Sequence, residues 1–270
     1  MRPKVHYHFP AAALAVEPPA PARHKAESVL AGIKGLLFYL WTFSLSLPLF
    51  VTMLVLAPFV AIFDKHRRLA QHFVNNIWAK VSTWPFYRVR IDGRHNLPRN
   101  DEPAVYVANH QSFLDIYTLF HLNRSFKFIS KTSNFLIPII GWSMFLTGHV
   151  KLNRTDRKSQ VKCLSECRDL LSKGASVLFF PEGTRSKTGQ IAEFKKGAFS
   201  IAAKAKVPVI PITLVGTGRI MPNGQESKMY PGNVHVIVHP AIEPKDANEM
   251  LAEAFDLISD PFYIEQRQTE

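Results

Sequence analysis

Residues 109 to 115 (NHQSFLD) place an imidazole and a carboxylate close together in the chain. His110 and Asp115 are five residues apart, which puts them about 140° apart on a helix, so a fully helical segment would separate them. They meet if His110 lies on a turn and Asp115 lies in the first turn of the following helix, with Ser112 as N-cap. The carboxylate would then fix the imidazole tautomer and leave the second ring nitrogen free as a general base. Taken alone, the motif also allows a capped helix beside a surface histidine.

A second polar motif, residues 180 to 186 (FPEGTRS), has the composition of an anion site. Arg185 offers a planar guanidinium that fits a phosphate, Gly183 lets the backbone approach a ligand closely, and Thr184 adds a hydroxyl. Glu182 is unusual beside a phosphate unless it holds Arg185 or a glycerol hydroxyl. Both motifs follow apolar, strand-like runs, so in a parallel sheet they emerge at the same edge.

The distribution of charge supports an anionic partner. The chain has 33 Lys and Arg against 21 Asp and Glu, a net charge of +12, and residues 151–219 alone hold 14 basic and 5 acidic residues. Lys131 and Arg154 are further candidates for the anion, whereas Lys195 and Lys196 are expected on a solvated face. A phospholipid surface, a phosphorylated substrate, an acidic carrier protein or a nucleic acid would each satisfy such a charge.

Other function classes are excluded by what the sequence lacks. It has no Gly-x-Ser-x-Gly elbow, no dinucleotide or Walker A loop and no His-Glu-x-x-His motif. Cys163 and Cys167 are four residues apart in a helical pattern and are expected to be small core residues in a reducing compartment. We therefore expect no metal and no cofactor, and without a recognisable reader motif we expect no nucleic acid partner.

Elements that would position these motifs alternate along the chain. Strand-like runs lie near residues 87–91, 104–108, 126–129, 149–152, 176–180, 209–215 and 234–238. Helix-like runs lie near residues 114–120, 159–173, 196–205 and 248–258. This alternation predicts an α/β fold with a mostly parallel central sheet flanked by helices.

An uncharged apolar run of 29 residues spans residues 35–63. As one straight helix it would be about 43 Å long, against a hydrocarbon core of about 30 Å. Pro48 lies near its middle and basic residues flank both ends, so we expect two short helices that dip into one leaflet, with a kinked single span as the alternative. The predicted organisation is a disordered segment at residues 1–26, membrane-anchoring helices at residues 27–68 and a folded domain at residues 69–270.

A shorter apolar patch occupies residues 135–148. Its 14 residues are too few to span a membrane, so we expect a core helix. The alternative is an interfacial helix with Trp142 at headgroup depth, bracketed by basic residues that suit an anionic surface. These basic residues are Lys127, Lys131, Lys151 and Arg154.

Four blocks in order make the chain resemble the glycerolipid acyltransferases, and within them the lysophosphatidate acyltransferases. The blocks are NHQSFLD at 109–115, GWSMFLTGHVKLNR at 141–154, FPEGTRS at 180–186 and VPVIPITL at 207–214. The likeness runs from about residue 60 to residue 240 and is strongest to plant plastid members, through WPFY, AVYVANHQSFLDIYTL and SFKFISK. The resemblance implies the acyltransferase α/β fold, with the acyltransferase domain at residues 69–270 and a membrane-embedded helical segment before it.

The resemblance also implies roles for individual residues. His110 and Asp115 match the catalytic dyad of the family. The residues that match its phosphate-binding positions are Glu182, Gly183, Thr184, Arg185, Arg154 and Lys131.

The implied reaction moves a fatty acyl group from a thioester of acyl carrier protein or coenzyme A to the sn-2 hydroxyl of 1-acyl-sn-glycerol 3-phosphate, giving phosphatidate. The plastid members favour acyl carrier protein as donor and the chloroplast envelope as location. The endoplasmic reticulum is the alternative, because the first 26 residues are poor in serine for a transit peptide. Rival functions are acylation of glycerol 3-phosphate or another lysophospholipid, and a non-catalytic basic membrane adaptor.

Overall fold

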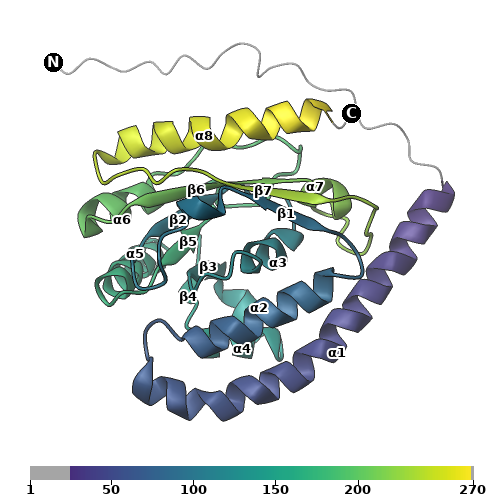
Figure 1. The fold of residues 1–270 in the computed structure, drawn as a ribbon, viewed down its shortest axis with the longest axis horizontal. Coiled ribbons are helices and arrows are strands. Elements are labelled where there is room, and N and C mark those ends of the chain that lie inside the picture. The colour runs from purple at the N-terminus through teal and green to yellow at the C-terminus, as the bar shows by residue number, and fades with distance from the viewer. Residues whose placement is uncertain (1–24, 269–270) are drawn as a thin grey trace.

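A seven-stranded mixed sheet forms the centre of the computed structural model, which describes residues 25–268 (Figure 1). The strand order is β1-β7-β6-β2-β5-β3-β4, and the five strands from β6 to β4 run parallel, whereas β7 is antiparallel to β6. The strands are β1 (Val89–Asp92), β2 (Val105–Ala108), β3 (Lys127–Lys131), β4 (Val150–Leu152), β5 (Val177–Phe179), β6 (Val209–Val215) and β7 (Val234–Val238). The predicted α/β fold with a mostly parallel sheet is confirmed.

Helices cover both faces of this sheet, as the buried residues of β2 show. Tyr106 packs into the core beneath α2 (Leu69–Thr83) and α3 (Leu114–Phe120), whereas Val105 and Val107 pack into the opposite core. The second core lies beneath α5 (Arg157–Ser172), α6 (Gly197–Ala205) and α8 (Ala247–Gln268). Successive strand residues point to opposite faces, so a fully apolar strand such as β2 requires a helical layer on each side.

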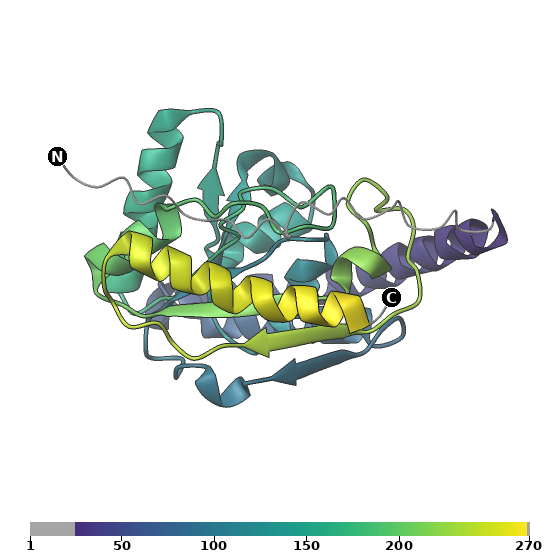
Figure 2. The ribbon, with the colours of Figure 1, turned by 90° about the horizontal axis from the view of Figure 1, so that it is seen from above.

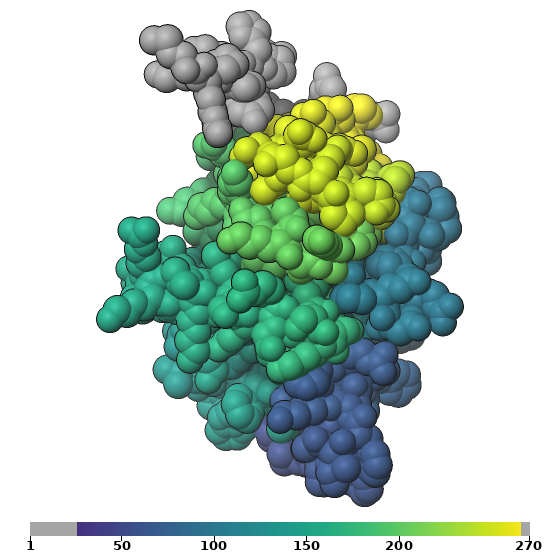
Figure 3. Space-filling view, turned by 90° about the vertical axis from the view of Figure 1, so that its left-hand side faces the viewer, coloured from purple at the N-terminus to yellow at the C-terminus, as the bar shows by residue number. Residues whose placement is uncertain are grey.

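The remaining short helices are η2 (Arg94–Asn96), η3 (Thr132–Leu136), α4 (Ile140–Thr147) and α7 (Thr217–Ile220). Every strand expected from the sequence is present, but α2 was not foreseen. The C-terminal helix is also longer than predicted, because it continues through Pro261. Figure 2 shows α8 lying across the sheet, and Figure 3 shows it at the opposite end of the molecule from the end of α1.

The apolar block folds as one continuous helix, α1 (Lys25–Phe63), so the prediction of two short helices is wrong. Pro48 and Pro58 both lie inside this helix. An interior proline removes one backbone hydrogen bond, which a helix tolerates by bending, and Figure 1 shows α1 curving around α2. Residues 1–24, most of the segment expected to be disordered, lie outside the described residues.

Much of α1 is exposed although it is apolar. It is the one helix among the described residues that is long and apolar enough to cross a membrane, with 22% of its most apolar window buried. Its buried side packs on the domain through Phe38, Thr42 and Met53. Trp78 of α2 reinforces this contact by donating to Ser46 Oγ over 2.9 Å. The outward side of α1 therefore presents a long apolar surface.

The patch at residues 135–148 is not a core helix, contrary to the first expectation. Leu136, Trp142 and Phe145 have 79%, 51% and 65% of their surfaces exposed. The Trp142 ring lies 5.9 Å from the ring of Phe50, so α4 sits beside α1. This exposed apolar surface agrees with the interfacial alternative.

One of the basic residues expected to bracket this patch is instead fully buried. Lys127 Nζ donates to the carbonyl oxygens of Arg67 and Thr147 over 2.6 and 2.8 Å, and lies 3.0 Å from His72 Nε2. Burial, followed by the charge of Arg68, lowers the pKa of Lys127 to about 7. The residue ties the turn between α1 and α2, together with the end of α4, to the central sheet.

Candidate active site

The turn between β2 and α3 brings His110 and Asp115 together. His110 Nδ1 donates to Asp115 Oδ2 over 2.8 Å, which is the arrangement that the spacing allowed. The same oxygen accepts from the backbone N–H groups of Gln111 (2.7 Å) and Ser112 (2.9 Å). Asp115 is fully buried, so the turn is wrapped around its carboxylate.

Ser112 is not the N-cap residue, which by position is Phe113. Its hydroxyl nevertheless accepts from Leu114 N over 3.2 Å and donates to the carbonyl of Met221 over 2.7 Å. Ser112 therefore both supports the first turn of α3 and ties it to the segment that follows α7.

The imidazole of His110 is held in a fixed orientation by more than Asp115. Its ring stacks on Phe180, with centroids 3.8 Å apart and planes 13° apart. The side chain is 13% exposed, and no described residue forms a hydrogen bond with its Nε2. A ring with one nitrogen bound to a carboxylate and the other free is suited to proton transfer.

Glu182 joins the two polar motifs. Its Oε1 accepts from His110 N over 2.6 Å and its Oε2 accepts from Ala192 N over 2.9 Å. Burial raises the pKa of Glu182 to about 7, although the two backbone N–H groups favour the charged form. Of the two alternatives considered for Glu182, a contact with Arg185 is not what the structure has, because both carboxylate oxygens accept from backbone N–H groups.

Gly183 has a backbone conformation that favours glycine. Its φ of +81° lies in the left-handed region, and a Cβ there would come within 2.5 Å of Lys195 Nζ. Lys195 is exposed, as expected, but its amine lies over this turn. Thr184, the next residue, is exposed at the same turn.

Arg185 is paired with a residue that the sequence did not single out. Its Nη1 lies 2.7 Å from Glu226 Oε1, and the two side chains are 33% and 34% exposed. No described residue forms a hydrogen bond with its Nε or Nη2. Arg154 is close enough that, after burial, the charge of Arg185 lowers the pKa of Arg154. Neighbouring guanidinium groups with unbonded donors have the chemistry that suits an anion.

Lys131 is placed less directly. It is the last residue of β3 and is exposed, beside Leu152 of β4. The parallel strands bring it to the same edge of the sheet as His110 and Arg185, although its side chain forms no hydrogen bond or ion pair with either of these described residues. Among the described residues, no group of His, Cys, Asp and Glu side chains could hold a metal ion.

Sequence reasoning missed three supports of the site: Asn109, Phe180 and Glu226. Asn109 is the first residue of the NHQSFLD motif but had no assigned role; its side-chain amide accepts from the N–H of Leu214 over 2.7 Å and donates to the carbonyl of Leu214 over 2.8 Å. Phe180 was part of a quoted motif but had no assigned role. Nothing in the spacing signalled Glu226, which is 41 residues from Arg185.

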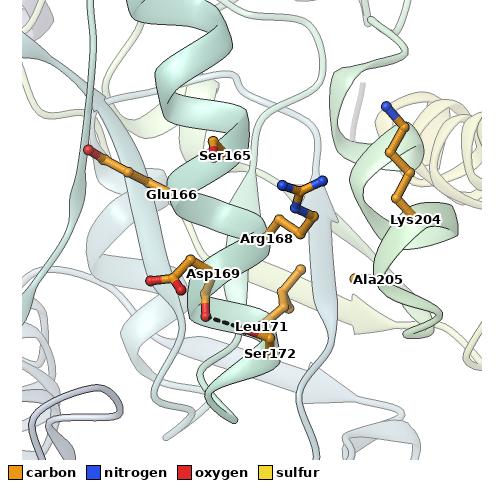
Figure 4. Close-up of a pocket in the computed structure, with 8 residues that line it drawn as sticks. All are labelled: Ser165, Glu166, Arg168, Asp169, Leu171, Ser172, Lys204 and Ala205. Carbon is orange, nitrogen blue, oxygen red and sulfur yellow. Dashed lines mark hydrogen bonds between the residues drawn. The ribbon is translucent and has the colours of Figure 1, made fainter.

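A surface hollow of about 680 Å³ lies between α5 and α6, away from these residues (Figure 4). Its lining residues carry both signs of charge, including Glu166, Arg168, Asp169 and Lys204. None of the candidate site residues lines it.

Comparison with known proteins defines the class to which this fold and site belong. A family model described as Acyltransferase matches residues 88–215, which include both polar motifs. The solved structure of PlsC, a 1-acyl-sn-glycerophosphate acyltransferase from Thermotoga maritima, superposes with a TM-score of 0.72 at 28% identity, covering 87% of this chain and 97% of that chain. The protein is an acyltransferase.

Two curated relatives narrow the class to a particular family. A 1-acyl-sn-glycerol-3-phosphate acyltransferase of Chlamydomonas reinhardtii is 67% identical over 84% of this chain and 68% of its own length. The chloroplastic enzyme LPAT1 of Arabidopsis thaliana is 56% identical over 78% of this chain and 60% of its own length. The chain belongs to the 1-acyl-sn-glycerol-3-phosphate acyltransferase family.

Proposed function

We propose that the protein transfers a fatty acyl group from an acyl thioester to the sn-2 hydroxyl of 1-acyl-sn-glycerol 3-phosphate, giving phosphatidate. The observation that carries this proposal is the His110–Asp115 pair beside an anion site at Arg185. The relatives support 1-acyl-sn-glycerol 3-phosphate as the acceptor, because each is called a 1-acyl-sn-glycerol-3-phosphate acyltransferase.

In the proposed mechanism His110 Nε2 takes the proton of the sn-2 hydroxyl as its oxygen attacks the thioester carbonyl. The imidazolium then returns a proton to the departing thiolate, so no covalent acyl-enzyme forms. Asp115 stabilises the imidazolium through the 2.8 Å hydrogen bond to Nδ1. A positioned base contributes typically about 10² to 10⁴ in rate.

The acceptor's phosphate would bind at the edge of the sheet where the strand ends gather. Arg185 would supply its free guanidinium donors, Arg154 a second guanidinium and Lys131 an ammonium group, with Thr184 adding a hydroxyl. The remaining residues of the motif, Glu182 and Gly183, form the turn that places Arg185 next to His110.

A membrane location accounts for α1 and α4. Both the acceptor and the product are lipids, and the exposed apolar surface of these helices suits a bilayer. We infer that residues 27–68 anchor the acyltransferase domain, residues 69–270, to the membrane. The chloroplastic relatives support a plastid location over the endoplasmic reticulum. We extend the proposal to the plastid envelope as the membrane and to acyl carrier protein, before coenzyme A, as the donor.

The test is an acyl-transfer assay on isolated membranes with radiolabelled donor. Lysophosphatidate and glycerol 3-phosphate are compared as acceptors, and acyl carrier protein and coenzyme A thioesters as donors. We expect phosphatidate from lysophosphatidate alone, and we expect His110→Ala to reduce the rate by about 10² or more while the protein stays in the membrane. Transfer to glycerol 3-phosphate would contradict lysophosphatidate as the acceptor. Full activity of His110→Ala would contradict His110 as the base.

A further inference from the structure

The loop between α7 and β7, residues 221–233, contacts the candidate phosphate site. Glu226 Oε1 lies 2.7 Å from Arg185 Nη1. Asn223 Nδ2 donates to the carbonyl oxygens of Arg185 and Ser186 over 3.3 and 3.0 Å. The loop therefore holds both the guanidinium and the backbone of the FPEGTRS motif.

The same loop also contacts α1. Tyr39 OH donates to the backbone carbonyl of Glu226 over 2.9 Å, and Met229 N donates to the carbonyl of Ala31 over 2.9 Å. Gly35 approaches the carbonyl of Ser227 so closely that a Cβ would lie 2.2 Å from it. The membrane-facing helix, the loop and Arg185 thus form one continuous series of contacts.

The pairing leaves part of the Arg185 fork available. Only Nη1 is bonded among the described residues, which leaves Nε and Nη2, the pair of donors that binds two oxygens of a phosphate. A long, one-third exposed arginine samples several rotamers, and ordering it on ligand binding has a cost in entropy. A carboxylate that already holds Nη1 reduces this cost.

We propose that Glu226 is a positioning residue for the acceptor: it orients Arg185 toward the acceptor's phosphate, and α1 places Glu226 through Tyr39. This inference rests on the proposed function, because it needs Arg185 to bind the phosphate. In this proposal α1, the helix that we place in the bilayer, also positions Arg185, the residue that binds the phosphate of the lipid acceptor.

The experiment measures kcat and separate KM values for lysophosphatidate and for the acyl donor, in mixed micelles where the lysophosphatidate mole fraction is varied. For Glu226→Ala we expect the acceptor KM to rise about twofold to fivefold, the upper part of the range for a partly exposed ion pair, with donor KM nearly unchanged. Glu226→Gln keeps an oxygen acceptor for Nη1 and is expected to recover part of this loss. Tyr39→Phe should shift the acceptor KM in the same direction by a smaller factor.

Trp41→Phe is the matched control. It also removes one side-chain donor from α1, but that donor bonds the carbonyl of Val81 in α2, at 2.9 Å, and not the 221–233 loop. We expect Trp41→Phe to leave the acceptor KM unchanged. Melting temperatures of all variants show whether each one is folded before its kinetics are compared.

The outcomes separate the two proposals. If Arg185→Ala leaves the acceptor KM unchanged, the phosphate-binding role within the proposed function is wrong. If Arg185→Ala raises it while a folded Glu226→Ala does not, only the inference about Glu226 is wrong. A lower acceptor KM in Glu226→Ala would also overturn it, because Glu226 would then compete with the phosphate for Arg185.

Discussion

Replacing Asp115 by Asn tests whether the buried carboxylate stabilises a positively charged His110 during the reaction. The substitution keeps the size of the side chain and an oxygen that can accept from His110 Nδ1. It removes the negative charge that lies 2.8 Å from that nitrogen. The geometry of the turn, in which the same oxygen also accepts from Gln111 N and Ser112 N, is therefore largely preserved.

The magnitude follows from the distance. Two unit charges 2.8 Å apart attract each other by about 6 kcal/mol at an effective dielectric constant of about 20. Asn retains a neutral hydrogen bond of about 1 kcal/mol, and water and the surrounding dipoles replace part of the lost attraction. We therefore expect kcat for Asp115→Asn to fall by about 10³, with little change in the acceptor KM.

A stability change accompanies this loss but does not explain it. Asp115 Oδ1 is buried and has no hydrogen-bond partner among the described residues, so an amide N–H₂ placed there would be unsatisfied. The cost is about 1–3 kcal/mol, which lowers the melting temperature by roughly 2–5 °C in a chain of this length. Assays at 20 °C would then compare folded enzymes.

The assay is phosphatidate formation at saturating acceptor and donor by the wild type, His110→Ala, Asp115→Asn and the double variant. If Asp115 acts through His110, the double variant is no slower than His110→Ala alone. Asp115→Asn activity above about one tenth of the wild type would refute the charge argument. Additive losses in the double variant would show that Asp115 acts independently of His110.

Two further predictions concern residues that support the site. Glu182→Gln leaves one of the backbone N–H groups of His110 and Ala192 without an acceptor. We therefore expect kcat to fall roughly tenfold or more while the acceptor KM changes little. A raised acceptor KM at unchanged kcat would instead place Glu182 in contact with the acceptor. Because burial lowers the pKa of Lys127 to about 7, the folded protein releases this proton at a lower pH than the unfolded chain. The free energy of unfolding therefore rises between about pH 7 and pH 10, by at most about 1.4 kcal/mol per unit, and Lys127→Met should remove this rise. Melting curves of the wild type and of Lys127→Met at pH 7 and pH 9 measure this rise. An equal change in stability between the two pH values in both proteins would contradict a buried Lys127 with a lowered pKa.

Short-range patterns determined the class of fold and the centre of the site. Apolar runs at period two and period 3.6 fixed the strands and most helices, because burial on one or two faces imposes those periods. The pairing of His110 with Asp115 followed from a spacing of five residues across a turn, and the carboxyl ends of parallel strands placed Arg185 at the same edge. Each of these conclusions needed only residues that are near in sequence or a general property of parallel sheets.

Long-range contacts decided the rest. Whether the apolar segment breaks at Pro48 depends on the packing of α1 against α2, which no local pattern specifies. Whether α4 is buried depends on what covers it, so its composition suited a core helix equally well.

The partners of the charged residues also depended on the tertiary structure. Glu226 meets Arg185 across 41 residues, and Tyr39 reaches the backbone of Glu226 across 187 residues. A charged side chain pairs with whichever partner the folded backbone brings within hydrogen-bond distance. The composition of the chain does not predict which distant residues will meet in this way. The sequence by itself therefore predicted His110 as the base and Arg185 as an anion-binding residue, and only the tertiary structure connected Arg185 to the long N-terminal helix α1.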